Sequence, residues 1–158
     1  ANTASHGICY GEVRPVYKAA TVCAGAVVDT YGDNTTTTRG TPVAASTTAD
    51  TFGAWTQITA SCNRVKALVC AFLNGNSNLT VSQDGAVEIG IGPNSGSVTS
   101  LVTIYGVSGN SGTGVFTPQN EGPFYVDIPS GSGIFARCKK QSGGASDRNV
   151  DIILYGVR

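Results

Sequence analysis

Hydrophobic positions along this chain recur in short runs with a period of two residues rather than 3.6. Val87, Ile89 and Ile91 alternate with polar residues or glycine, as expected for a strand with one buried face. Glycine and proline interrupt the chain so often that no stretch long enough for a stable helix has a continuous apolar side. The pattern therefore predicts an all-β protein with negligible helix.

Seven segments have the composition of strands and are bounded by Gly, Ser, Asn or Pro. Among them, Arg64–Leu73 is apolar enough to be buried on both faces. The predicted strands are Phe52–Thr59, Arg64–Leu73, Ala86–Ile91, Val98–Val107, Phe124–Ile128, Ile134–Gln141 and Val150–Val157. Their regular spacing predicts a jelly roll or a related antiparallel β-sandwich, because two packed sheets need only short connections.

The first fifty residues differ in composition, with a Pro-interrupted segment followed by a Thr-rich one. Such a stretch cannot build a core alone, so we divide the chain into an extended N-terminal arm with edge strands, residues 1–50, and a β-sandwich domain, residues 51–158. We expect one or two edge strands within Val16–Val28. Apolar residues in the arm are candidate contacts with another subunit: Val13, Val16, Tyr17 and Val22.

The charge balance excludes several classes of partner. Ten basic and ten acidic side chains give a net charge of zero, and charged residues make up only 13% of the chain. No global field attracts nucleic acid or an anionic membrane. The longest apolar run, Ala67–Leu73, is far shorter than the roughly 20 residues of a membrane-spanning helix. We therefore expect neither nucleic acid nor a membrane as a partner.

The five cysteines contain no C-x-x-C pair and form an odd set, so they match neither a zinc site nor a complete disulfide framework. Cys70 and Cys138 lie within predicted strands, where a small apolar side chain suits packing. We expect most of the cysteines to be reduced and buried. The alternative is one or two disulfides, within or between chains, that involve Cys9 or Cys23.

No pattern of residues indicates catalysis. The one histidine, His6, lies near a terminus, and the motifs of hydrolases, zinc proteases and nucleotide-binding loops are absent from the sequence. The carboxylates available for glycoside hydrolysis fall on polar positions of strands or in turns: Asp84, Glu88, Glu121, Asp127, Asp147 and Asp151. We therefore predict a protein that is not an enzyme, with no catalytic residues, no cofactor and no metal.

Two further groups of side chains could contact partners. Alternation places Arg137 and Lys139 on one face of a strand, with Lys140 opposite, which favours a solvated face or intersubunit salt bridges over an anion site. Aromatic side chains either fill the sandwich and its interfaces, which is the favoured interpretation, or stack on a glycan. The candidates for glycan contact are Trp55, Tyr105 and Tyr125.

Residues 126–138 read VDIPSGSGIFARC, and residues 147–157 read DRNVDIILYGV. They resemble the I-P-x-G-x-x-I-A-A-R and V-D-V-x-L-Y-G strands of tailed-phage virion structural proteins, and residues 52–58, FGAWTQI, resemble their G-x-W-x-Q-I strand. Phe135 stands where those sequences have a small residue. The resemblance extends over Thr51–Arg158, about two thirds of the chain, and implies a jelly roll that decorates a capsid or forms part of a fibre.

The resemblance leads to one expected function, and two alternatives from other functional classes stand beside it. We expect a capsid decoration (cement) protein, a homotrimer on the capsid surface of a virion assembled in the host cytoplasm. Its partner would be the major capsid protein, whose neighbouring subunits it would bridge. The first alternative is a glycan- or receptor-binding module of a phage tail fibre or a secreted lectin. The second is a small carbohydrate-active enzyme with two converging carboxylates.

Overall fold

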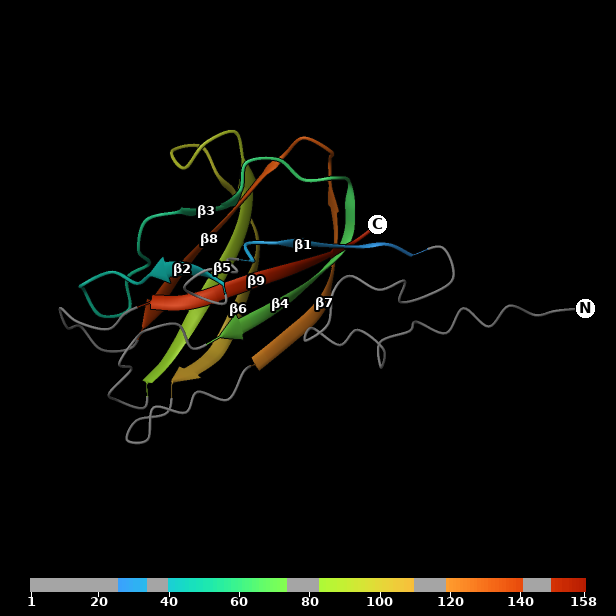
Figure 1. The fold of residues 1–158 in the computed structure, drawn as a ribbon. Coiled ribbons are helices and arrows are strands. Elements are labelled where there is room, and N and C mark those ends of the chain that lie inside the picture. Colours follow the sequence, from blue (N-terminus) through green and yellow to red (C-terminus); the bar gives the residue numbers. More distant parts are fainter. Residues whose placement is uncertain (1–25, 34–39, 74–82, 110–118, 141–148) are drawn as a thin grey trace, which may run out of the picture.

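The computed structural model describes residues 26–33, 40–73, 83–109, 119–140 and 149–158, which form strands and turns in two packed antiparallel sheets (Figure 1). The prediction of an all-β protein is confirmed. No helix in these residues is long and apolar enough to span a membrane. The strands are β1 (Val28–Tyr31), β2 (Thr41–Ala44), β3 (Thr56–Thr59), β4 (Val65–Leu73), β5 (Gln83–Gly92), β6 (Thr99–Gly109), β7 (Gln119–Ile128), β8 (Gly133–Lys140) and β9 (Asn149–Val157).

The strands pair in a nested order. Strands β1 and β2 pair with β9, β3 pairs with β8, β4 with β7, and β5 with β6. Pairing of β4 with β9 and of β5 with β8 joins these strand pairs into two sheets. Sheet A has the order β1-β9-β4-β7, with β2 also paired to β9, and sheet B has the order β3-β8-β5-β6. Two packed sheets with this order form a jelly roll, the architecture that the strand spacing predicted.

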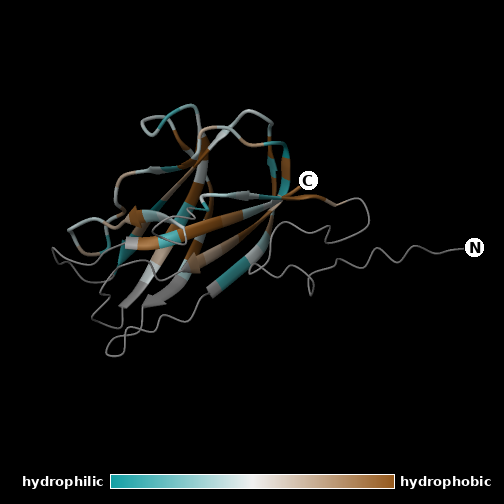
Figure 2. Ribbon diagram, in the orientation of Figure 1, coloured by the Kyte–Doolittle hydropathy of each residue, from teal (hydrophilic) through white to brown (hydrophobic). Residues whose placement is uncertain are grey.

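The core lies between the two sheets and is built from alternate residues of their central strands. Leu68 and Phe72 of β4 meet Ile89 of β5 and Ile134 of β8, and all four side chains are fully buried. Burial of each such side chain contributes roughly 1.5–3 kcal/mol to folding. Figure 2 shows hydrophobic residues along β4 and β9, the strands that run through the middle of sheet A.

Sheet A also carries buried apolar side chains on the face that points away from sheet B. This outer layer of sheet A consists of Val28, Val69, Ala71, Ile153 and Tyr155. In β4 the outer-layer residues alternate with core residues, so this strand is buried on both faces, as its composition predicted. Antiparallel sheets commonly have one solvated face, so sheet A departs from that pattern.

All seven predicted strands are present, although β3 forms only the last part of its predicted segment, Phe52–Thr59. Two edge strands of four residues were not predicted as strands of their own, β1 and β2, and both belong to sheet A. Only the last residue of Val16–Val28 lies in β1. The arm residues Val13, Val16, Tyr17 and Val22 lie outside the described residues.

Three cysteines can be compared with the prediction of reduced, buried thiols. Cys62, Cys70 and Cys138 are buried thiols that form no disulfide, which confirms the prediction for these residues. Burial raises the pKa of both Cys70 and Cys138 to about 12, so both remain protonated thiols at neutral pH. Cys9 and Cys23 lie outside the described residues.

We expect Cys70 and Cys138 to resist alkylation in the native protein, because the thiolate is the reactive form and both side chains are enclosed. Mass spectrometry after iodoacetamide treatment at pH 8 should find both unmodified before denaturation and fully modified in urea without reductant. Rapid modification of either cysteine in the folded protein would contradict this expectation.

Candidate functional site

The candidate site lies on the face of sheet B that points away from sheet A, and it begins with a short segment docked along β8. The backbone N–H of Asp50 donates to the carbonyl of Lys140 at 2.8 Å, and the N–H of Gly53 donates to the carbonyl of Cys138 at 2.9 Å. Residues 50–53 thereby continue the edge of sheet B beyond the start of β3 and carry the next side chains over β8.

Gly53 allows this segment to pass close to the end of β2. A Cβ atom at this position would lie 2.2 Å from the carbonyl oxygen of Ala44, a distance that real atoms do not adopt. Asp50 precedes it with a positive φ of 53°, a left-handed conformation that aspartate tolerates better than most residues. These two residues position the aromatic side chains of Phe52 and Trp55.

Two aromatic rings, two cations and one carboxylate form the site, which we call the aromatic–cation cluster: Phe52, Trp55, Glu88, Arg137 and Lys139. The guanidinium carbon of Arg137 lies 4.8 Å from the centroid of Phe52 and 4.4 Å from that of Trp55. The Nζ atom of Lys139 lies 5.6 Å from the centroid of Phe52. All three distances are within the range of cation–π attraction, which also fixes the plane of the guanidinium.

Glu88 and Arg137 face each other across β5 and β8, and Arg137 Nε donates to Glu88 Oε2. The Glu88 side chain is only 10% exposed and that of Arg137 31%. Burial alone would raise the pKa of Glu88, but hydrogen bonds with Arg137 and Ser100 and the charge of Arg137 outweigh it. The pKa of Glu88 is therefore lower than usual.

The prediction that Arg137 and Lys139 share one strand face agrees with their common contact to Phe52. The sequence had favoured a solvated face or intersubunit salt bridges, whereas Arg137 pairs with Glu88 of its own chain. Among the described residues, no second carboxylate forms an ion pair with either cation. Two cations and one carboxylate leave the cluster with a net charge of +1.

The three aromatic residues predicted as glycan contacts do not form one platform. Trp55 belongs to the aromatic–cation cluster, while Tyr105 is 73% exposed on β6 of the same sheet. Tyr105 lies in register with Ala86, whose other neighbour is Lys139, so it lies near the cluster. Tyr125, 67% exposed, lies on β7 in sheet A.

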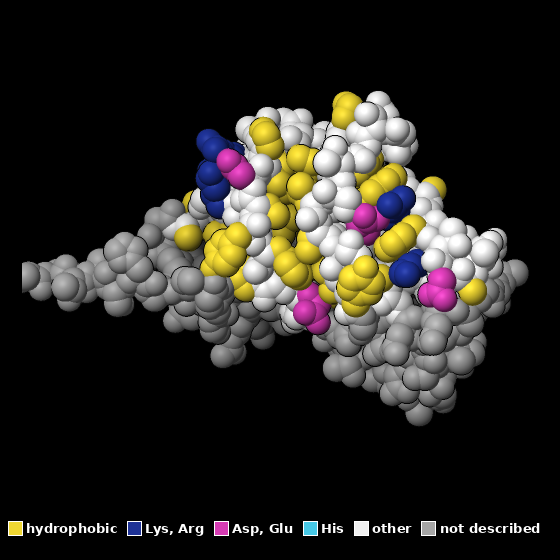
Figure 3. Space-filling view, turned by 180° about the vertical axis from the view of Figure 1, so that it is seen from behind, with side chains coloured by type: hydrophobic (Ala, Val, Ile, Leu, Met, Phe, Trp, Pro, Cys, Tyr) yellow, Lys and Arg dark blue, Asp and Glu magenta, His cyan; other side chains and the backbone are white. Residues whose placement is uncertain are grey.

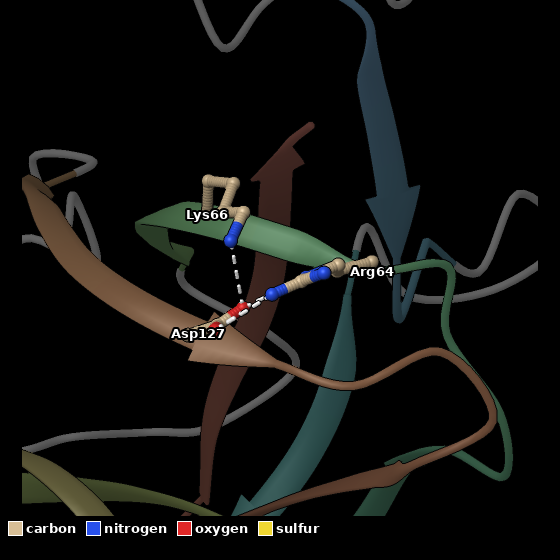
Figure 4. A network of polar contacts seen from close by, with 3 residues as sticks. All are labelled: Arg64, Lys66 and Asp127. Carbon is tan, nitrogen blue, oxygen red and sulfur yellow. Dashed lines mark hydrogen bonds and ion pairs between the residues drawn. The ribbon is translucent and has the colours of Figure 1, made fainter.

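A second charged group lies on sheet A, where Arg64 and Lys66 converge on Asp127 of β7 (Figure 4). Arg64 donates from Nε to Oδ1 at 3.0 Å and from Nη2 to Oδ2 at 2.9 Å, and Lys66 Nζ lies 3.0 Å from Oδ1. These hydrogen bonds hold the pKa of Asp127 well below its usual range. All three side chains are more than half exposed, so the group contributes little to stability.

Charged and hydrophobic side chains are mixed on the molecular surface seen in Figure 3. Most of the acidic side chains in this view lie beside Lys or Arg side chains, and hydrophobic side chains are exposed between the charged groups. The surface therefore presents neighbouring apolar and paired charged areas rather than one extended field.

The expectation that strand carboxylates lie on solvated polar positions is wrong for two residues. Glu88 is buried against Arg137, and Asp151 of β9 is only 1% exposed. Asp151 alternates with the core residues of β9 and therefore faces the outer layer of sheet A instead of water. Its Oδ2 atom has no hydrogen-bond partner, and burial raises its pKa.

The described carboxylates that were considered for glycoside hydrolysis are divided between the two sheets. Glu88 belongs to sheet B, whereas Glu121, Asp127 and Asp151 belong to sheet A. In the part of the chain that the structure describes, no three His, Cys, Asp or Glu side chains are grouped to hold a metal ion. His6, Asp147 and the side chain of Asp84 are outside the described part.

The sequence did not indicate Phe52 as a site residue, and Glu88 was considered only as a carboxylate for glycoside hydrolysis. Cation–aromatic contacts depend on how residues 50–53 dock onto β8, and the only local signal was the turn-forming Asp50 and Gly53 before an aromatic strand.

Comparison of the chain with family models, curated proteins and solved structures finds no significant match.

Proposed function

We propose that this chain is a non-enzymatic virion structural protein, a capsid decoration protein that bridges and stabilises major capsid protein subunits as a homotrimer on the capsid surface. The observation that carries the proposal is a jelly-roll framework that leaves large apolar side chains exposed on both sheets. Tyr125 of sheet A is 67% exposed, and Tyr105 of sheet B is 73% exposed. Exposed apolar side chains of this size suit a protein whose task is contact with other polypeptide.

The sequence resemblance to tailed-phage structural proteins supports the same proposal. Its motifs, residues 52–58, 126–138 and 147–157, coincide with β3, the end of β7, and the strands β8 and β9. Because β8 and β9 are interior strands of the two sheets, the resemblance concerns the framework of the jelly roll. The zero net charge is compatible with attachment through apolar and hydrogen-bonding contacts.

The proposal is tested by adding the purified chain to tailed-phage capsids that lack it and sedimenting the mixture. We expect the chain to pellet in a fixed ratio to the major capsid protein and to raise the temperature at which the capsids disrupt. A variant lacking residues 1–20 tests the predicted contacts of Val13, Val16 and Tyr17, and should bind more weakly. The proposal is refuted if all of the added protein stays in the supernatant when the capsids come from the phage that encodes it.

A glycan- or receptor-binding module is the second candidate, and the exposed rings of Tyr105 and Tyr125 favour it. Aromatic rings exposed to this extent can stack on sugars, although these two lie on different sheets. Binding to a glycan array that is lost in Tyr105→Ala or Tyr125→Ala, together with no binding to capsids, would select this candidate.

A further inference from the structure

The aromatic–cation cluster has a positive charge that its own residues do not neutralise. Glu88 accepts the Nε–H of Arg137, and no carboxylate among the described residues pairs with Lys139. Both cations lie against one ring, that of Phe52, at 4.8 and 5.6 Å from its centroid. Phe52 and Trp55 thus hold two positive charges close together at a partly exposed place on sheet B.

We propose that this cluster binds a carboxylate side chain, Asp or Glu, of a partner polypeptide. The proposal rests on the proposed function and adds the chemistry of the contact. Arg137 is held in plane by two rings and by Glu88, so its guanidinium is oriented before a ligand arrives. Its terminal N–H groups can donate to a carboxylate in a fork, while Lys139 adds a second charge.

A polypeptide suits this site better than a sugar does. A sugar needs an open aromatic face on which to stack, but within the cluster Arg137 lies over Trp55, and Arg137 and Lys139 lie over Phe52. The ring faces turned toward the centre of the cluster are therefore already in contact with cations. What remains for a ligand is a group of N–H donors beside apolar walls, which matches an acidic side chain and its neighbours in a polypeptide.

Trp55 is the only tryptophan of the chain, so its fluorescence reports directly on the cluster. The probe is an acetylated and amidated peptide of alternating Glu and Gly, titrated into the full chain at low ionic strength. We expect a saturable change in the emission of Trp55 with a Kd below about 1 mM, which added salt weakens. The same peptide with Gln in place of Glu should cause no saturable change.

The variant Lys139→Gln removes one cation without disturbing the pair of Arg137 with Glu88, and should weaken peptide binding about fivefold. Lys66→Gln, on the other sheet, is the matched control and should bind like the wild type. No saturable response to the Glu peptide, or an equal response to the Gln peptide, would overturn the proposal. Binding of glucuronate but not of the peptide would also overturn it and assign the cluster to an acidic sugar.

The failure of this proposal and the failure of the capsid function can be told apart. If wild type and Lys139→Gln attach equally to capsids and neither binds the peptide, the carboxylate site is wrong while capsid decoration stands. If the wild type binds the peptide, the Lys139→Gln variant binds it more weakly, and neither protein sediments with capsids, the carboxylate site stands and the capsid assignment is wrong.

Discussion

Replacement of Asp151 by asparagine is expected to raise the free energy of unfolding at pH 7 by about 1–3 kcal/mol. Asp151 is 1% exposed, and its Oδ2 has no hydrogen-bond partner, so the folded protein holds a carboxylate that water would solvate better. Asparagine has nearly the same shape but no charge. Urea unfolding of both proteins, monitored by the fluorescence of Trp55, measures the difference.

The effect of Asp151→Asn should depend on pH with a definite sign. Burial raises the pKa of Asp151 in the folded state above its unfolded value of about 3.9. The destabilisation caused by the buried carboxylate, and with it the advantage of Asp151→Asn, is therefore fully present above the folded-state pKa. It declines as the pH falls through that pKa and vanishes below the unfolded-state pKa, where the carboxyl group is protonated in both states. The control Asp127→Asn removes an exposed carboxylate whose pKa is lowered, and should not stabilise. Equal or lower stability of Asp151→Asn at pH 7 would contradict the expectation.

Replacement of Arg137 by methionine is expected to lower the free energy of unfolding at pH 7 by about 2–4 kcal/mol. The change leaves the Glu88 carboxylate, 10% exposed, without its cation, and also removes the contacts of the guanidinium with Phe52 and Trp55. Because the methionine side chain fills a volume similar to that of arginine, the loss of stability reports mainly on the missing charge. A double-mutant cycle with Glu88→Gln, measured by urea unfolding, separates the pair from the packing.

The double variant Glu88→Gln/Arg137→Met should be more stable than Arg137→Met alone, because no buried charge then lacks a partner. In the wild type the pKa of Glu88 is lowered, so the stability from this pair is present above the unfolded pKa and is lost as the pH falls through the folded pKa. Lys139→Met, on the same strand face, serves as the control and should cost less than about 1 kcal/mol. A loss in Arg137→Met no larger than in this control would show that the pair does not stabilise the fold.

The long strands could be predicted from sequence because their apolar side chains alternate or run continuously over many residues. Continuity in β4 corresponds to the observed burial, whereas β5, whose alternation predicted one buried face, is buried at Ala86 and Glu88 as well as at Val87 and Ile89. The edge strands β1 and β2 are too short for such a pattern, and Pro42 within β2 argues against a strand at that position. They form because β9 presents a free edge on which they can pair.

The candidate site could be predicted only in part. Strand alternation placed Arg137 and Lys139 on one face, because that inference needs only local geometry. The contacts with Phe52 and Trp55 depend on a segment that docks on β8 from outside the regular sheet. Asp151 was misjudged because alternation distinguishes two faces of a strand but does not reveal whether the second face meets water.

The nested pairing of the strands also constrains how the chain is synthesised. Strand β9 pairs with β1, β2 and β4, yet about a hundred residues separate it from β2 along the chain. A nascent chain on the ribosome therefore presents β1, β2 and one side of β4 without a partner until β9 emerges. Translation that stops before β9 is expected to yield an aggregation-prone product, not a smaller folded domain.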